Sequence, residues 1–151
     1  MDTFQLEDAI RRDAVSSARF GGVKAADELP TCVDHSRKFF IVNTHNSYQT
    51  GEHWVAMYLD PVPEFFDSLA LSPEYYKKSF QYFLVNHGPS YRHNVKRLQS
   101  SDSIVCGQYC LFYIYHRSRN ISMKLMFDMF SEDLESNDRL VSEFCAKVYG
   151  V

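Results

Sequence analysis

Apolar positions along this chain recur at helical spacing near both ends and form denser runs in the middle. The first helix is predicted over residues 3–17, where apolar side chains are spaced among charged ones, and we expect Gly21 and Gly22 to end it. A second helix is predicted over residues 74–86, because Pro73 suits a first helical turn and His87-Gly88-Pro89 stops the pattern.

Runs of β-branched and aromatic residues predict the strands. Three strands are expected over residues 38–43, 53–59 and 64–69, and a fourth over residues 91–98. The second and third are joined by Asp60-Pro61-Val62-Pro63, which we expect to turn because proline donates no ladder hydrogen bond.

Three further helices are predicted after residue 105. An almost wholly apolar helix runs from Cys106 to about Arg117, and shorter helices cover residues 123–130 and 138–148. Asn120-Ile121-Ser122 is expected to form a loop and a helix cap, and Ser136-Asn137 to cap the last helix. Strands clustered in the middle with helices around them indicate an α+β fold.

Length, composition and net charge limit the number of domains and the kinds of partner. The 151 residues, 45% of them hydrophobic and 15% aromatic, fit a single domain over residues 1–151 with a substantial core. A formal net charge of −3 gives no global case for nucleic-acid binding, and we interpret a local basic cluster (Arg92, His93, Lys96 and Arg97) as a solvated face. We expect no cleaved signal peptide, and no apolar run is long enough to span a bilayer.

Four cysteines are too few for a disulfide scaffold in a chain of this size, which favours a reducing compartment (Cys32, Cys106, Cys110 and Cys145). Cys110 is interpreted as a packing residue within its helix. A Cys-x-x-x-Cys spacing without a second close pair is weak evidence for zinc, so no metal site is predicted.

Cys106 is the candidate nucleophile. It stands where the apolar helix begins, and the free N–H groups and positive dipole end of a helix favour a thiolate there. Gly107 permits close backbone approach directly after it. The alternative is that Cys106 is a small core residue, which is the commoner role of a buried cysteine.

His53 and Asp67 are the candidate base and its orienting carboxylate. A carboxylate can fix the tautomer of an imidazole that takes a thiol proton. The two positions differ by 14, an even number, so a hairpin centred near Asp60 brings them to one face, opposite or diagonal, with the register left open. Asp60 itself is about 23 Å from His53 along an extended strand. The alternatives are a structural histidine and a turn-capping aspartate.

Gln99 precedes Cys106 by seven positions, in the polar loop Gln99-Ser100-Ser101-Asp102-Ser103. Its amide, together with the N–H of Cys106, is a candidate pair of donors for the oxyanion of an acyl-transfer reaction. The alternative is an ordinary polar loop residue.

In combination these motifs resemble adenain-like cysteine proteases of adenoviruses and Maverick or Polinton elements, which are related to the ubiquitin-like-protein proteases. The resemblance covers about residues 20–117, and it rests on four stretches (Ile41-Val42-Asn43-Thr44, Gly51-Glu52-His53-Trp54-Val55-Ala56, Phe65-Phe66-Asp67-Ser68, and Gln99 through Cys110). It implies an α+β cysteine-protease fold with a central mixed or antiparallel sheet flanked by helices. It also implies the roles of nucleophile for Cys106, base for His53, orienter for Asp67 and oxyanion donor for Gln99.

The resemblance implies a thiol endopeptidase that cleaves viral or mobile-element capsid and core precursors through an acyl-enzyme, acting in the host nucleus or cytoplasm or packaged in a virion. The chain departs from the adenoviral pattern at Asp67, where those enzymes carry glutamate, so removal of ubiquitin or a ubiquitin-like modifier is the alternative. A catalytically silent interaction module is a third hypothesis. The expected partner is a protein substrate, with no membrane. No cofactor is required, and an activating peptide or DNA stays open.

Overall fold

The computed structural model describes residues 1–151 and contains a five-stranded sheet with the order β1-β2-β3-β4-β5. The central strands β2, β3 and β4 pair antiparallel, whereas the two edge strands pair parallel with their neighbours, so the sheet is mixed. The strands are β1 (Phe20–Lys24), β2 (Phe39–Asn43), β3 (Trp54–Tyr58), β4 (Glu64–Phe66) and β5 (Arg92–His93).

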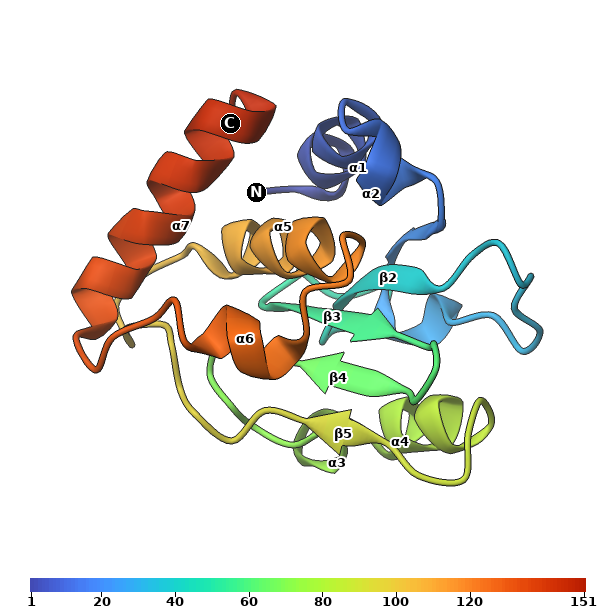
Figure 1. The fold of residues 1–151 in the computed structure, drawn as a ribbon. Helices are drawn as coiled ribbons and strands as arrows, with labels where there is room; N and C mark the ends of the chain where they lie inside the picture. The colour runs from blue at the N-terminus through green and yellow to red at the C-terminus, as the bar shows by residue number, and fades with distance from the viewer.

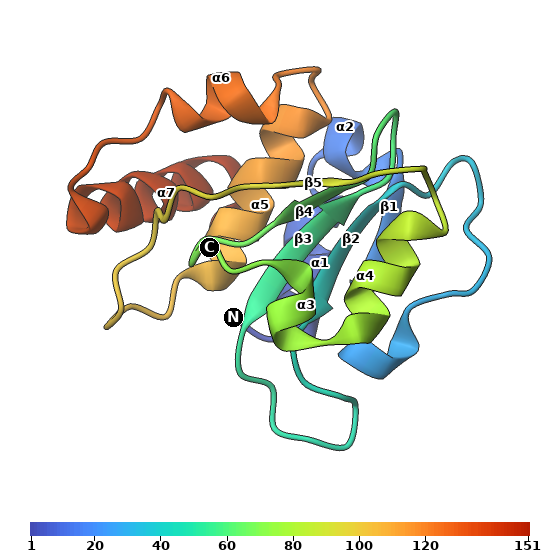
Figure 2. The same cartoon turned by 90° about the horizontal axis from the view of Figure 1, so that it is seen from below.

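Helices cover both faces of this sheet, which confirms the α+β fold (Figures 1 and 2). Helix α5 lies over one face, with α1, α6 and α7 around it, and α4 lies over the other. No helix is both long and apolar enough to cross a bilayer. The helices are α1 (Thr3–Arg11), α2 (Ala14–Ser17), the 3-10 helix η1 (Ala26–Glu28), α3 (Pro73–Tyr76), α4 (Lys78–Val85), α5 (Cys106–Arg117), α6 (Met123–Phe127) and α7 (Leu134–Tyr149).

Strand β2 shows why its apolar run is continuous. Phe39 and Ile41 join the core shared with α1, α5 and α7, whereas Phe40 and Val42 join the core shared with α4. Successive side chains of a strand point to opposite faces, and both faces of this sheet are covered. Every residue of β2 is therefore buried.

Helix α5 is the centre of the larger core. Ten of its twelve residues are buried, as expected of a helix that is apolar on nearly all sides. Near its C-terminal end, the Arg117 guanidinium donates to both carboxylate oxygens of Glu64 at 2.9 and 3.0 Å, and the Tyr113 hydroxyl donates to the same carboxylate at 2.6 Å. These bonds tie α5 to β4.

The prediction that Gly21 and Gly22 end the first helix is wrong. The predicted helix is divided at Asp13, whose carboxylate accepts from the N–H of Ser16 and caps α2, and the glycines lie in edge strand β1. A Cβ on Gly21 would lie 2.3 Å from Cε1 of Phe40, and Gly22 has φ +120°. The pair therefore permits a bulged strand that packs closely on β2.

Two other predicted elements are shorter or divided. Lys77 is extended, with φ −154° and ψ 138°, and separates α3 from α4 within the predicted helix. The predicted strand over residues 91–98 contains only the two residues of β5, because from Asn94 onwards side-chain hydrogen bonds replace the ladder. The third strand likewise ends at Phe66, earlier than predicted.

The predicted cap of the last helix is also wrong. Helix α7 begins at Leu134 with Asp133 at the N-cap position, so Ser136 and Asn137 lie in its first turn. The predicted cap at Ser122 is confirmed, since its hydroxyl accepts from the N–H of Leu125 at 3.1 Å.

Candidate active site

His53 lies at the last position of the β2–β3 loop, directly before β3, and is 8% exposed. Its Nε2 is 2.7 Å from Oδ1 of Asp67. Ala56 pairs with Phe66, so the register continued by one residue puts Asp67 opposite Val55, two positions from His53. The pair is thus diagonal across the hairpin, one of the two arrangements that the even spacing allows.

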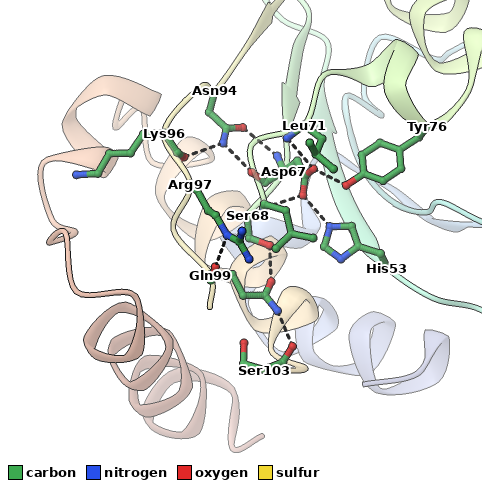
Figure 3. A network of polar contacts seen from close by, with 11 residues as sticks. His53, Asp67, Ser68, Leu71, Tyr76, Asn94, Lys96, Arg97, Gln99 and Ser103 are labelled. Atoms are coloured by element: carbon green, nitrogen blue, oxygen red, sulfur yellow. Dashed lines mark hydrogen bonds and ion pairs between the residues drawn. The ribbon is translucent and has the colours of Figure 1, made fainter. Parts of the chain in front are cut away.

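Asp67 directly follows β4 and is fully buried. Its Oδ1 accepts from His53 and from the N–H of Leu69 at 3.0 Å, and its Oδ2 accepts from the N–H of Leu71 at 3.1 Å and the hydroxyl of Tyr76 at 2.6 Å (Figure 3). A buried carboxylate needs such partners to remain charged. Two donors on each oxygen also fix the plane of the carboxylate that faces the imidazole.

The main chain of Asp67 is held by a second side chain, that of Asn94. Its Oδ1 accepts from the N–H of Asp67 at 2.9 Å, and its Nδ2 donates to the carbonyl of Asp67 at 2.6 Å (Figure 3). Asn94 follows β5, the neighbour of β4. One amide therefore replaces the strand pairing at the point where β5 ends, and it fixes the backbone that carries the acid.

Cys106 is the first residue of α5 and is 8% exposed. Burial acts to raise the pKa of its thiol, but His53 and hydrogen bonds from the backbone of Trp54 and Gly107 outweigh burial and lower the pKa below its ordinary value. The pKa of Cys110, one turn further on, is raised by complete burial, and burial raises that of Cys145 to about 12. Of these three buried cysteines, Cys106 is the one whose surroundings favour a thiolate.

The electrostatics of His53 mirror those of the thiol. Burial acts to lower the pKa of the imidazole, yet Asp67 and Cys106 together raise it to about 9. Because Nε2 is engaged by Asp67, Nδ1 is the ring nitrogen that remains for the thiol. The two opposite shifts favour a thiolate beside an imidazolium over a neutral thiol beside a neutral imidazole.

Tyr76 supports the same pair from α3. Its ring lies beside that of His53, with centroids 5.9 Å apart and planes inclined by 26°. Burial and the bond to Asp67 raise the pKa of its hydroxyl, so that it stays protonated and donates.

Gln99 lies in the loop before α5 and is 3% exposed. Its Nε2 donates to the carbonyl of Ser103 at 2.9 Å, and its Oε1 accepts from the hydroxyl of Ser68 at 2.6 Å (Figure 3). Helix α7 supports this loop through Asp138, which accepts from the Ser100 hydroxyl at 2.6 Å.

The predicted residues meet at one cleft of about 1080 Å³. His53, Gln99 and Cys106 all line it, and Asp67 lies behind His53. The β2–β3 loop and the loop before α5 contribute further to its walls, among them the exposed side chain of Ile104. Asp60 lies elsewhere and pairs with Arg19 at 2.7 Å.

The residues of the basic cluster do not line this cleft. Arg92 and His93 form β5, Lys96 pairs with Glu132 at 3.1 Å, and Nε of Arg97 donates to the carbonyl of Gln99 at 2.9 Å. No group of three or more histidine, cysteine, aspartate or glutamate side chains is arranged to hold a metal ion.

Three residues that support the site were not predicted to do so, namely Ser68, Tyr76 and Asn94. Each lies in a turn, a short helix or a strand end whose pairing depends on the register of β4 and β5. Only the Asp67-Ser68 dipeptide stood within a motif that the sequence analysis had singled out.

Comparison with known proteins identifies solved structures that share this fold. No family model matches the chain, and no curated protein gives a significant sequence match. A solved ASFV protease matches 100% of this chain and 68% of its own length, with 19% identity and a TM-score of 0.59. ChlaDub1 from Chlamydia trachomatis matches 99% of this chain and 81% of its own, with 16% identity and a TM-score of 0.53.

A third match is the Chlamydia trachomatis effector protein Cdu1, solved bound to ubiquitin, which covers 99% of this chain and 80% of its own length with 14% identity and a TM-score of 0.52. The chain therefore has the fold of the ubiquitin-like-protease type of cysteine protease, as the motifs predicted.

Proposed function

We propose that this chain is a cysteine protease in which Cys106 is the nucleophile, His53 the general base and acid, Asp67 its orienting carboxylate and Gln99 an oxyanion donor. The observation that carries the proposal is the Asp67–His53 bond of 2.7 Å beside a cysteine of lowered pKa, at a cleft of about 1080 Å³. Base, orienter and nucleophile at one cleft are what thiol-dependent acyl transfer needs.

The reaction begins with a thiolate at Cys106 and a proton on His53. The sulfur attacks the substrate carbonyl, a C–S bond forms, and the electron pair of the carbonyl moves onto its oxygen. We assign the donors to this oxyanion to the N–H of Cys106 at the start of α5 and the side-chain amide of Gln99, two residues that line the same cleft. Collapse breaks the C–N bond, and the amine leaves with the proton from His53.

The resulting thioester is then hydrolysed. Water attacks the acyl carbon while its proton passes to His53, and the C–S bond breaks to release the carboxylic acid and restore the thiolate. Asp67 holds the same ring orientation through both halves of the cycle, since its carboxylate is itself fixed by four donors.

As the substrate we propose a capsid or core precursor of a virus or mobile element, cleaved within its chain. The likeness to a viral protease supports this choice, together with the order of the motifs around His53, Asp67, Gln99 and Cys106. A second substrate class has support of its own, because Cdu1 was solved with ubiquitin bound. Under that alternative the chain removes ubiquitin or a ubiquitin-like modifier.

The two substrate classes can be separated by a direct assay. Purified protein is incubated with glycine-containing precursor peptides and, in parallel, with ubiquitin and ubiquitin-like modifiers carrying a C-terminal fluorophore, each with and without DNA. Cleavage of the peptides alone supports the endopeptidase, and release of the fluorophore from a modifier alone supports the isopeptidase. In either case Cys106→Ser is expected to abolish turnover, and retained turnover in this variant contradicts the assignment of the nucleophile.

A catalytically silent module is the outcome that contradicts the proposal altogether. It would be indicated by a folded protein that turns over none of these substrates and whose Cys106 reacts with iodoacetamide no faster than a free thiol at the same pH.

A further inference from the structure

Ser68 is bonded to Gln99 through both its main chain and its side chain. Its carbonyl accepts from the N–H groups of Leu98 and Gln99 at 2.9 and 3.1 Å, and its hydroxyl donates to Oε1 of Gln99 at 2.6 Å (Figure 3). Ser68 is 1% exposed, so water does not compete for these bonds. Residue 68 also directly follows Asp67, which places the support of Gln99 in the same turn as the acid.

The direction of the Gln99 amide follows from its two partners. A carbonyl oxygen only accepts, so the Gln99 atom 2.9 Å from the carbonyl of Ser103 is the nitrogen. The amide oxygen then faces Ser68, and the serine hydroxyl is the donor. The second N–H of Nε2 makes no hydrogen bond within the protein, and Gln99 lines the cleft together with Cys106.

Rotation about the last torsion of a glutamine is otherwise nearly free. Without the hydroxyl of Ser68, the buried Oε1 of Gln99 would lose its donor, and an unpaired buried oxygen is costly enough to turn the amide toward another partner. The free N–H would then no longer be held in one direction.

We propose that Ser68 is a positioning residue, which holds the Gln99 amide with its free N–H directed to the oxyanion position beside Cys106. It touches no substrate and acts only through Gln99. This inference rests on the proposed function, because it concerns the oxyanion that the cysteine protease reaction develops.

The test is a double-mutant cycle with Ser68→Ala, Gln99→Ala and the double variant, assayed on the substrate that the wild type cleaves. Removal of an oxyanion donor lowers kcat by about 10²–10³. Ser68→Ala is expected to lower kcat by at least about 10-fold while KM changes by less than about twofold, the signature of an interaction made in the transition state. In the Gln99→Ala background, Ser68→Ala is expected to cause no further loss, because residues that act as a unit are non-additive.

Iodoacetamide alkylation of Cys106 distinguishes a positioning role of Ser68 from a general structural role, because a disturbed site would also change the alkylation rate. Alkylation requires the thiolate but develops no oxyanion, so its rate and pH profile are expected to be the same in Ser68→Ala and the wild type. The matched control is Ser16→Ala, which removes another buried serine hydroxyl, one that lies on α2 outside the cleft and donates to the N-cap residue Asp13. It is expected to leave kcat unchanged.

Two results overturn the inference alone. One is an active wild type whose Ser68→Ala variant keeps its full kcat, and the other is a loss that adds to that of Gln99→Ala or is accompanied by slower alkylation. A wild type that turns over no substrate is a different outcome, since it contradicts the proposed function and the inference with it.

Discussion

The hydroxyl of Tyr76 donates a 2.6 Å hydrogen bond to Oδ2 of Asp67, while Oδ1 of the same carboxylate holds His53. Tyr76 also lies beside the ring of His53, so one side chain contacts both members of the pair. The carboxylate of Asp67 is therefore held at one oxygen by His53 and at the other by a tyrosine whose hydroxyl remains a donor.

Tyr76→Phe is predicted to destabilise the protein. It removes the donor to a buried carboxylate and keeps the ring beside His53, and a hydrogen bond to a charged group contributes about 1.5–3 kcal/mol. Urea unfolding measures the loss. The matched control is Tyr82→Phe, which removes an exposed hydroxyl without a protein partner on α4 and should leave the free energy of unfolding unchanged. Equal stability of the two variants would contradict this role of Tyr76.

Asn94→Ala is predicted to be more severe. Two buried backbone groups of Asp67 lose their partner, at a cost of about 1–3 kcal/mol each. The amide hydrogen of Asp67 should also exchange faster with solvent, because it is no longer bonded. Asn86→Ala, at the exposed C-terminal end of α4, is the control. If the amide hydrogen of Asp67 were still protected from exchange in Asn94→Ala, the Asn94 side chain would not be what holds the main chain of Asp67.

Cys106 is predicted to react with iodoacetamide before the other cysteines below pH 8. Its pKa is lowered by His53 and by backbone N–H groups, whereas those of Cys110 and Cys145 are raised by burial. Mass spectrometry of the folded protein maps the labelled site. In His53→Ala the alkylation profile should shift to higher pH, because the thiolate loses its neighbouring cation. Equal labelling of Cys106, Cys110 and Cys145 would show that the Cys106 thiol is not activated.

The pH dependence of stability follows from counting protons. His53 has a folded pKa of about 9, above its unfolded value of about 6.5, so its contribution is present below pH 6.5 and is lost as the pH rises through 9. Cys106 has a folded pKa below its unfolded value of about 8.5, so its contribution is present above that value and is lost as the pH falls through the lowered folded pKa.

These two slopes cancel above both pH 6.5 and the lowered pKa of the folded Cys106 thiol, and below about pH 8.5. In that window the pair holds one proton in each state, on the imidazole in the folded protein and on the sulfur in the unfolded chain. Within this window the pair should therefore cause no change of the wild-type melting temperature with pH. In Cys106→Ala, which keeps Asp67 beside His53, the melting temperature should fall as the pH rises. A variant with a flat profile would show that the carboxylate alone does not hold the proton on His53.

The residues that meet at the candidate site could be predicted because each is marked by a short stretch of sequence. The even separation of His53 and Asp67 allows both side chains to lie on one face of a hairpin. The apolar residues after Cys106 indicate a buried helix whose first residue is the cysteine. The triad roles themselves stay predictions until the variants are assayed.

Features that depend on tertiary contacts could not be predicted in the same way. Gly21 and Gly22 are weak in any secondary-structure pattern, and they become a strand only because β1 packs against Phe40. Asn94 lies within the strand predicted over residues 91–98, and its bonds to Asp67 appear only once β4 and β5 lie side by side. Lys77 separates two helices although no proline or glycine marks the break.

The bonds of Arg117 and Tyr113 to Glu64 join the far end of the nucleophile-bearing helix to the strand that leads into the acid. Cys106 and Asp67 are consequently carried by two elements that side-chain hydrogen bonds join to each other, and His53 is bonded to the second of them. We expect adjustment to a bound polypeptide to come from the ten-residue connection between β2 and β3, upstream of an imidazole that stays on Asp67.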